Sequence, residues 1–140
     1  MKRIVVAAAL AAGFLSHAAS AETLHFHGTL AGASEVPPKT SNGKGECDAT
    51  YDTATRTLNY TITYTGLSGP ATMAHFHGPA DPDKNAPIVV PFSPPTSPIK
   101  GSTVLTEAQA ADLMAGKWYG NVHTAANPGG EIRCQMMPVK

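Results

Sequence analysis

Short segments in which apolar and polar residues alternate recur along the chain, and this period of two is typical of β-strands with one buried face. The clearest example is residues 57–65 (TLNYTITYT), where leucine, isoleucine and tyrosine fall on one face and threonine and asparagine on the other. Residues 23–30 (TLHFHGTL) alternate in the same way, with Leu24 and Phe26 on the apolar face. Further strands are predicted at 45–52, 72–78, 88–92, 100–105, 118–124 and 131–138.

One segment follows a helical pattern instead. Thr106 and Gln109 have the spacing of a capping box, in which each residue bonds the backbone of the other. Good helix formers follow, and Gly116 is a typical helix stop. We therefore predict one short helix at 107–115.

The segments between these elements are rich in turn-forming residues. The chain contains 13 glycines and 12 prolines, and the run 127–130 (NPGG) is strong turn chemistry. About eight short strands joined by frequent turns are typical of a β-sandwich or barrel. The predicted fold is all-β, an Ig-like or Greek-key sandwich or barrel with one short helix, and no domain boundary interrupts it.

The amino-terminal residues 1–21 have the features of a secretory signal peptide. A basic start precedes an apolar run at 4–15, and small residues ending at Ala21 form a cleavage site. The apolar run is shorter than the roughly 20 residues that a membrane-spanning helix needs. Cleavage would leave 22–140 as a single domain in the periplasm or outside the cell, not inserted in the membrane. A buried amino-terminal helix is the alternative interpretation.

The charge balance and the motifs exclude several classes of function. The chain has 10 basic and 10 acidic residues, so it lacks the electrostatic footprint of a nucleic-acid-binding protein. It contains no G-x-S-x-G, Walker or dinucleotide-binding motif, and we assign no catalytic residue. Glu131 and Arg133 share one strand face, a spacing that favours a surface ion pair.

The two cysteines, Cys47 and Cys134, fit an exported protein. Disulfides persist in oxidising compartments, so we favour a bridge between them. Two free thiols and two soft metal ligands are the alternatives.

Histidines and a methionine are the candidate ligands for a metal. Four histidines form two His-x-His pairs, His25/His27 and His75/His77, and each pair presents two imidazoles on one strand face. His123 lies on a late strand that could approach one pair, and three imidazoles suit copper or zinc. The alternative for these histidines is a solvent-facing or hydrogen-bonding role.

Met73 precedes His75 by two residues and so faces the same side of the strand. Its thioether is a soft donor that favours Cu(I), which makes it a further candidate ligand. The alternative is that the methionine fills a gap in the core.

Four sequence motifs span nearly all of the predicted mature chain. They are 30–38 (LAGASEVPP), 64–70 (YTGLSGP), 74–80 (AHFHGPA) and 119–133 (YGNVHTAANPGGEIR). Together they resemble the CHRD (chordin-type) domain family. The resemblance implies an Ig-like β-domain that is loosely similar to Cu/Zn superoxide dismutase.

The resemblance also carries the family's His-x-His-Gly-Pro and Asn-Val-His-Thr motifs. On this basis we expect His75, His77 and His123 to be metal ligands, with Met73 and the His25/His27 pair as optional additions. The His25/His27 pair and the two cysteines depart from the family pattern.

Three functions are compatible with the sequence. We favour a periplasmic or secreted metal-binding protein that captures, stores or transfers an ion, preferring copper over zinc, with another envelope protein as exchange partner. The second is a non-catalytic extracellular interaction or structural module, in which the histidines only brace loops. The third is a superoxide dismutase-like enzyme, whose full histidine pattern is not present here. Tight metal binding would distinguish the metal-binding protein and the enzyme from the interaction module.

Overall fold

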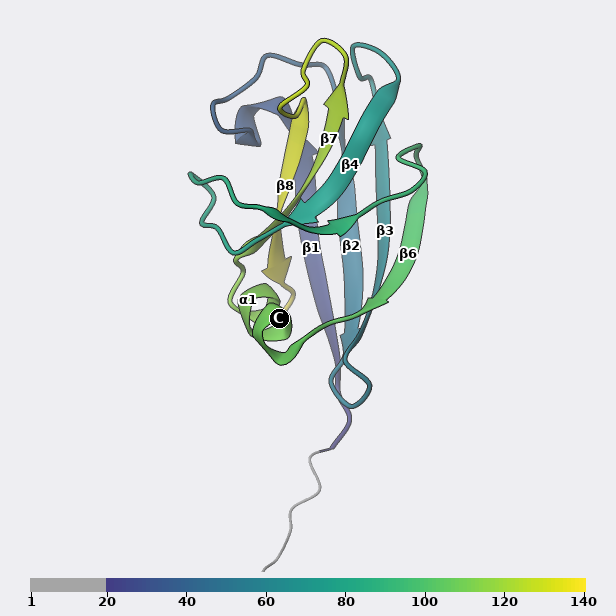
Figure 1. Cartoon of the computed structure of the whole chain (residues 1–140), viewed down its shortest axis with the longest axis vertical. Coiled ribbons are helices and arrows are strands. Elements are labelled where there is room, and N and C mark those ends of the chain that lie inside the picture. The colour runs from purple at the N-terminus through teal and green to yellow at the C-terminus, as the bar shows by residue number, and fades with distance from the viewer. Residues whose placement is uncertain (1–19) are drawn as a thin grey trace, which may run out of the picture.

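The computed structural model describes residues 20–140 (Figure 1). The predicted signal peptide lies outside the described residues, apart from its last two positions. The described chain contains eight strands and one α-helix. They are β1 (Thr23–Ala31), β2 (Lys44–Asp52), β3 (Thr57–Thr65), β4 (Ala71–His77), β5 (Ile88–Pro91), β6 (Ile99–Val104), α1 (Glu107–Met114), β7 (Trp118–Thr124) and β8 (Ile132–Pro138). Every predicted element is confirmed to within one residue at each end, and the 3-10 turn η1 (Gly32–Ser34) is an addition.

All the strands belong to one antiparallel sheet, in the order β5-β4-β7-β8-β1-β2-β3-β6. The sheet curves into a nearly closed barrel, and β5 and β6 are its two edge strands (Figure 1). The all-β prediction is therefore confirmed, and of the two forms expected the barrel describes the sheet better. β4 and β7 are neighbours in this order although a long segment separates them in sequence, which brings distant motifs side by side.

The interior of the barrel holds the apolar face of each strand. Phe26, Leu58, Ile62, Phe76 and Trp118 are each 2% exposed or less. Helix α1 packs beside β8 and buries Leu113. The predicted capping box is confirmed, because the Gln109 backbone N–H donates to Thr106 Oγ1 at 3.2 Å and the Thr106 N–H donates to Gln109 Oε1 at 2.9 Å.

A buried disulfide joins Cys47 on β2 to Cys134 on β8, as predicted. Strand β1 lies between these two strands, and its Gly28 is the register partner of Cys47. A Cβ atom at Gly28 would lie 3.1 Å from the Cβ of Cys134 and 2.3 Å from the carbonyl oxygen of Gln135. Glycine at this position therefore gives the bridge room to pass across the strand.

Candidate metal centre

The outer face of β4 and β7 carries most of the candidate ligands. In the antiparallel register the pairs on this face are Met73 with His123, His75 with Asn121, and His77 with Tyr119. Ala74 and Phe76 alternate with the histidines and point into the core, at 1% and 0% exposed. The period of the strand thus places both histidines of the pair outside the barrel, next to His123.

Loops cover this outer face, so the three histidines are buried although they lie outside the barrel. His75, His77 and His123 are 7%, 9% and 6% exposed. The segment between β4 and β5 contacts His77 through Ala86, and the segment between β7 and β8 contacts His123 through Pro128. The alternative that His75 and His77 face solvent is therefore wrong.

The three imidazoles form one compact cluster. A ring nitrogen of each lies within 4.8 Å of a ring nitrogen of the other two. The ring centroid of His75 lies 5.0 Å from that of His123 and 5.3 Å from that of His77. Since copper and zinc sit about 2.0–2.1 Å from imidazole nitrogens, a modest contraction of the cluster would let one ion reach all three.

Backbone carbonyls fix the orientation of two of these rings. Nδ1 of His77 lies 2.9 Å from the carbonyl oxygen of Ala86, and Nδ1 of His123 lies 2.8 Å from that of Pro128. In a neutral ring each Nδ1 therefore carries the proton and donates it, which leaves the lone pair on Nε2. Metal-binding histidines are commonly held in this way, with one N–H bonded to a carbonyl and the other nitrogen free for the ion.

His75 contributes a nitrogen that has no hydrogen-bond partner. Its Nδ1 is buried and unpaired within the described part of the chain. Burial, together with the neighbouring His123 and His77, lowers the pKa of His75 to about 4. Burial also lowers the pKa of His77, although its hydrogen bonds to Ala86 and Asn121 act in the opposite direction. Both rings are thus held in the neutral form that binds a metal, and the unpaired nitrogen of His75 is a donor that an ion would satisfy.

Asn121 lies between the imidazoles and a buried carboxyl group. Its Oδ1 lies 3.0 Å from Nε2 of His77 and 2.9 Å from Nε2 of His123. Its Nδ2 lies 3.4 Å from Oε1 of Glu35, which is 4% exposed. Burial raises the pKa of Glu35 to about 7, more than the contacts with Asn121 and Arg133 lower it. No pattern in the sequence placed Glu35 beside the histidines, whereas Asn121 alternates with His123 on the same strand face.

An aromatic stack supports His77 from the side. Its ring is parallel to that of Tyr119, with 4.8 Å between centroids and 3° between planes. The guanidinium carbon of Arg133 lies 3.5 Å from the centroid of the same Tyr119 ring. His77 and Arg133 thus stack on opposite faces of the Tyr119 ring, and this stack holds the His77 ring in place.

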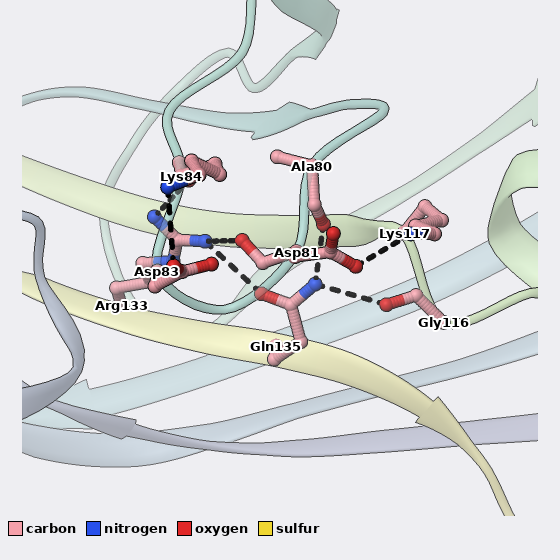
Figure 2. A network of polar contacts seen from close by, with 8 residues as sticks. All are labelled: Ala80, Asp81, Asp83, Lys84, Gly116, Lys117, Arg133 and Gln135. Atoms are coloured by element: carbon pink, nitrogen blue, oxygen red, sulfur yellow. Dashed lines mark hydrogen bonds and ion pairs between the residues drawn. The ribbon is translucent and has the colours of Figure 1, made fainter.

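Arg133 also holds the loop that orients His77 (Figure 2). Its guanidinium donates to the carbonyl oxygens of Asp81 and Lys84 and to the side chains of Asn85 and Gln135. Ala86 follows Asn85 in that loop, and its carbonyl oxygen accepts the Nδ1 proton of His77. Arg133 is therefore a positioning residue for the cluster.

The predicted surface ion pair between Glu131 and Arg133 is wrong. Both residues are 1% exposed, and no ion pair joins them within residues 20–140. The loops that fold over β8 bury both side chains and supply each with separate partners.

Glu131 ties together the loops beside the cluster. It accepts hydrogen bonds from the Ser68 N–H and from the side chains of Ser41, Ser68, Thr124 and Asn127. Burial alone would raise its pKa, but the bonds from Ser68, Thr124 and Ser41 prevail and lower it to about 2.

Stability should therefore fall in acid through Glu131. Because the folded-state pKa is below the ordinary value of 4.5, its contribution is complete above pH 4.5 and is lost as the pH falls towards 2. We expect Glu131→Gln to lower the free energy of unfolding by about 2–3 kcal/mol at pH 7 and by much less near pH 2. Urea unfolding of both proteins between pH 7 and pH 2 checks this. A constant difference across that range would contradict the role of the charge.

Met73 lies at the rim of the outer face and is 48% exposed, so it does not fill the core. Its register partner on β7 is His123, so the Met73 side chain starts on the same strand face, next to one histidine of the cluster.

The His25/His27 pair lies elsewhere, on the outer face of β1, with β7 and β8 between it and β4. The two ring nitrogens of His27 lie 2.8 Å from Asp48 Oδ1 and 3.1 Å from Glu46 Oε2. The hydrogen bond with Asp48 raises the pKa of His27. The structure does not bring this pair to the three-histidine cluster, and for His25 and His27 the exposed position is the one observed.

Comparison with protein families identifies the domain. The model of the CHRD domain matches residues 26–136, a range that contains the whole histidine cluster and both cysteines. This chain belongs to the CHRD domain family. No curated protein and no solved structure matches it, so the expected likeness to superoxide dismutase has no structural comparison behind it.

CHRD is an extracellular-type domain, and the buried disulfide of this member agrees with an oxidising compartment. The family therefore indicates a secreted module. Among residues 20–140, no helix is long and apolar enough to cross a membrane.

Proposed function

We propose that this CHRD domain is a periplasmic or secreted metal-binding protein in which His75, His77 and His123 hold one copper ion for capture, storage or transfer. The observation that carries the proposal is the buried cluster itself, with a nitrogen of each ring within 4.8 Å of the others. Burying three imidazoles together is costly when one of their nitrogens has no hydrogen-bond partner, unless a ligand satisfies that nitrogen.

The donor set favours copper over zinc. Imidazole suits both metals, but a thioether is a soft ligand that favours Cu(I). The side chains of opposite residues in an antiparallel pair start about 4.5–5.5 Å apart, so Met73 can reach an ion beside His123. Zinc is the second metal that the three imidazoles alone would accept.

The rim position of Met73 also suits transfer. The methionine is exposed while the three histidines are buried, so an ion would meet the thioether before the imidazoles. Another envelope protein with soft ligands could exchange Cu(I) at this rim by sharing the ion during transfer. Met73 is thus the residue that we place on the path between solvent and cluster.

Titration of the mature protein tests the proposal. We expect one equivalent of Cu(I) to bind in competition with a chromophoric chelator, with weaker binding of Zn(II) measured under the same conditions. Binding of neither copper nor zinc below about 1 μM, a scale of about 8 kcal/mol, would contradict the proposal. That result would leave the histidines as braces for loops in an extracellular interaction module.

A further inference from the structure

Two ring nitrogens of the cluster already have a partner in the metal-free protein. Nδ1 of His77 and Nδ1 of His123 face backbone carbonyls, so Nε2 is the nitrogen that each ring has left for an ion. Both Nε2 atoms face the same amide atom of Asn121, at 3.0 Å and 2.9 Å. The side chain of Asn121, which is 4% exposed, therefore occupies the place that the two rings converge on.

We propose that the Asn121 carboxamide is an internal competitor for the metal, a latch that caps His77 and His123 in the metal-free protein and must leave before an ion binds. This inference rests on the proposed function and adds to it how the site is kept closed.

The hydrogen-bonding rules decide which amide atom faces the rings. A neutral imidazole that donates from Nδ1 presents only a lone pair at Nε2, and a lone pair needs an N–H partner. The amide NH2 has two N–H groups and can serve both rings, whereas the amide oxygen can donate to neither. The complementary arrangement is the amide turned over about its last side-chain bond, with NH2 towards the histidines. The amide oxygen then replaces Nδ2 beside Oε1 of Glu35, and the Glu35 carboxyl group must carry a proton to donate to it.

Charge favours this arrangement over two cationic rings. The alternative that keeps the oxygen between the rings requires an N–H on all four nitrogens, and so two positive charges in a buried cluster. The guanidinium of Arg133 already lies against the opposite face of the Tyr119 ring that stacks on His77. A second and third buried cation in this neighbourhood would be costly.

An NH2 group in this place excludes the ion. It has no lone pair to offer a metal, and in the turned amide it takes the place of Oδ1, at 3.0 Å and 2.9 Å from the two nitrogens that the ion would need. Glycine at position 130 is what lets the Asn121 and Glu35 side chains pack here, since a Cβ there would lie 2.6 Å from Nδ2 of Asn121 and 2.4 Å from Oε1 of Glu35.

The substitution Asn121→Ala tests the latch. We expect the dissociation constant for Cu(I) to fall roughly tenfold, because the ion no longer has to displace two hydrogen bonds. Asn59→Ala is the matched control, an exposed asparagine on β3 whose loss should leave the affinity unchanged. Weaker binding by Asn121→Ala would overturn the proposal and make the amide oxygen a fourth ligand.

A second measurement uses the unaltered protein and does not depend on how the variant folds. In nitrogen-detected NMR without metal, Nε2 of His77 and His123 should report unprotonated, hydrogen-bonded nitrogens, and the Asn121 NH2 protons should be protected from exchange. One equivalent of copper should remove that protection. Protonation of both nitrogens in both rings would overturn the latch. Absence of copper binding by every form of the protein would instead be the failure of the proposed function, and the metal-free spectrum would still test the hydrogen bonds.

Discussion

Replacing His77 with alanine should lower the affinity for Cu(I) by at least about a hundredfold, and His123→Ala should have a similar effect. Loss of an outer hydrogen-bond partner typically costs a metal site roughly 10–100-fold, and these substitutions remove a ligand itself. Backbone carbonyls orient both rings, so each substitution removes an imidazole that is already positioned for the ion. His75→Ala should act in the same direction, because it removes the unpaired nitrogen. Competition titration of each variant with a chromophoric chelator measures the effect.

His25→Ala is the matched control for this series. It removes an exposed histidine from a His-x-His pair of the same spacing, but on β1 and away from the cluster. The affinity of the His25→Ala variant for Cu(I) should equal that of the unaltered protein. An equal loss from His25→Ala and His77→Ala would show that the binding site is not the buried cluster. Folding of each variant is checked by its urea midpoint, because all three cluster histidines are buried.

Removing the disulfide should have the largest effect on stability. The bridge closes a loop with a sequence separation of 87 residues, which on the chain-entropy model contributes about 4–5 kcal/mol. We therefore expect the double variant Cys47→Ala/Cys134→Ala to unfold at a much lower urea concentration, and the protein to be only marginally stable.

The unaltered protein under a strong reductant provides the comparison. Both cysteines are 0% exposed, so the bridge should resist reduction until the protein unfolds, and the native protein should show no reactive thiol. An unchanged urea midpoint in the double variant would contradict the stabilising role. Rapid alkylation of the native protein would contradict the bridge itself.

The local pattern predicted the elements of this fold closely because each strand is amphipathic and each break contains turn chemistry. Residues 57–65 illustrate this, since their alternation matches β3 at both ends. The order of strands was not predictable in the same way. The neighbours β4 and β7 come together through pairings across long segments, and alternation within a strand does not say which partner it has.

The same limit applies to the candidate site. The spacing of His75 and His77 on one strand predicted a shared face, and their family motif linked them to His123; the structure brings these three together. Nothing in the alternation said that this face would be covered. Burial comes from loops, and it is the loops that place Glu35 beside Asn121.

The His25/His27 pair shows why spacing alone is not decisive. It has the same sequence spacing as His75/His77, but the carboxylates on the adjacent strand β2 engage its ring at His27. Which pair is near a third imidazole depends on strand order, which a single sequence pattern does not contain.

The most direct test of the central claim is a crystal structure of the copper-loaded protein, with an anomalous difference map measured at the copper edge. A single strong peak is expected on the outer face of β4 and β7, about 2.0–2.1 Å from a nitrogen of each of His75, His77 and His123, with the Asn121 amide turned away. A protein loaded with one equivalent that shows no peak at this cluster, or a peak only beside His25 and His27, would contradict the claim.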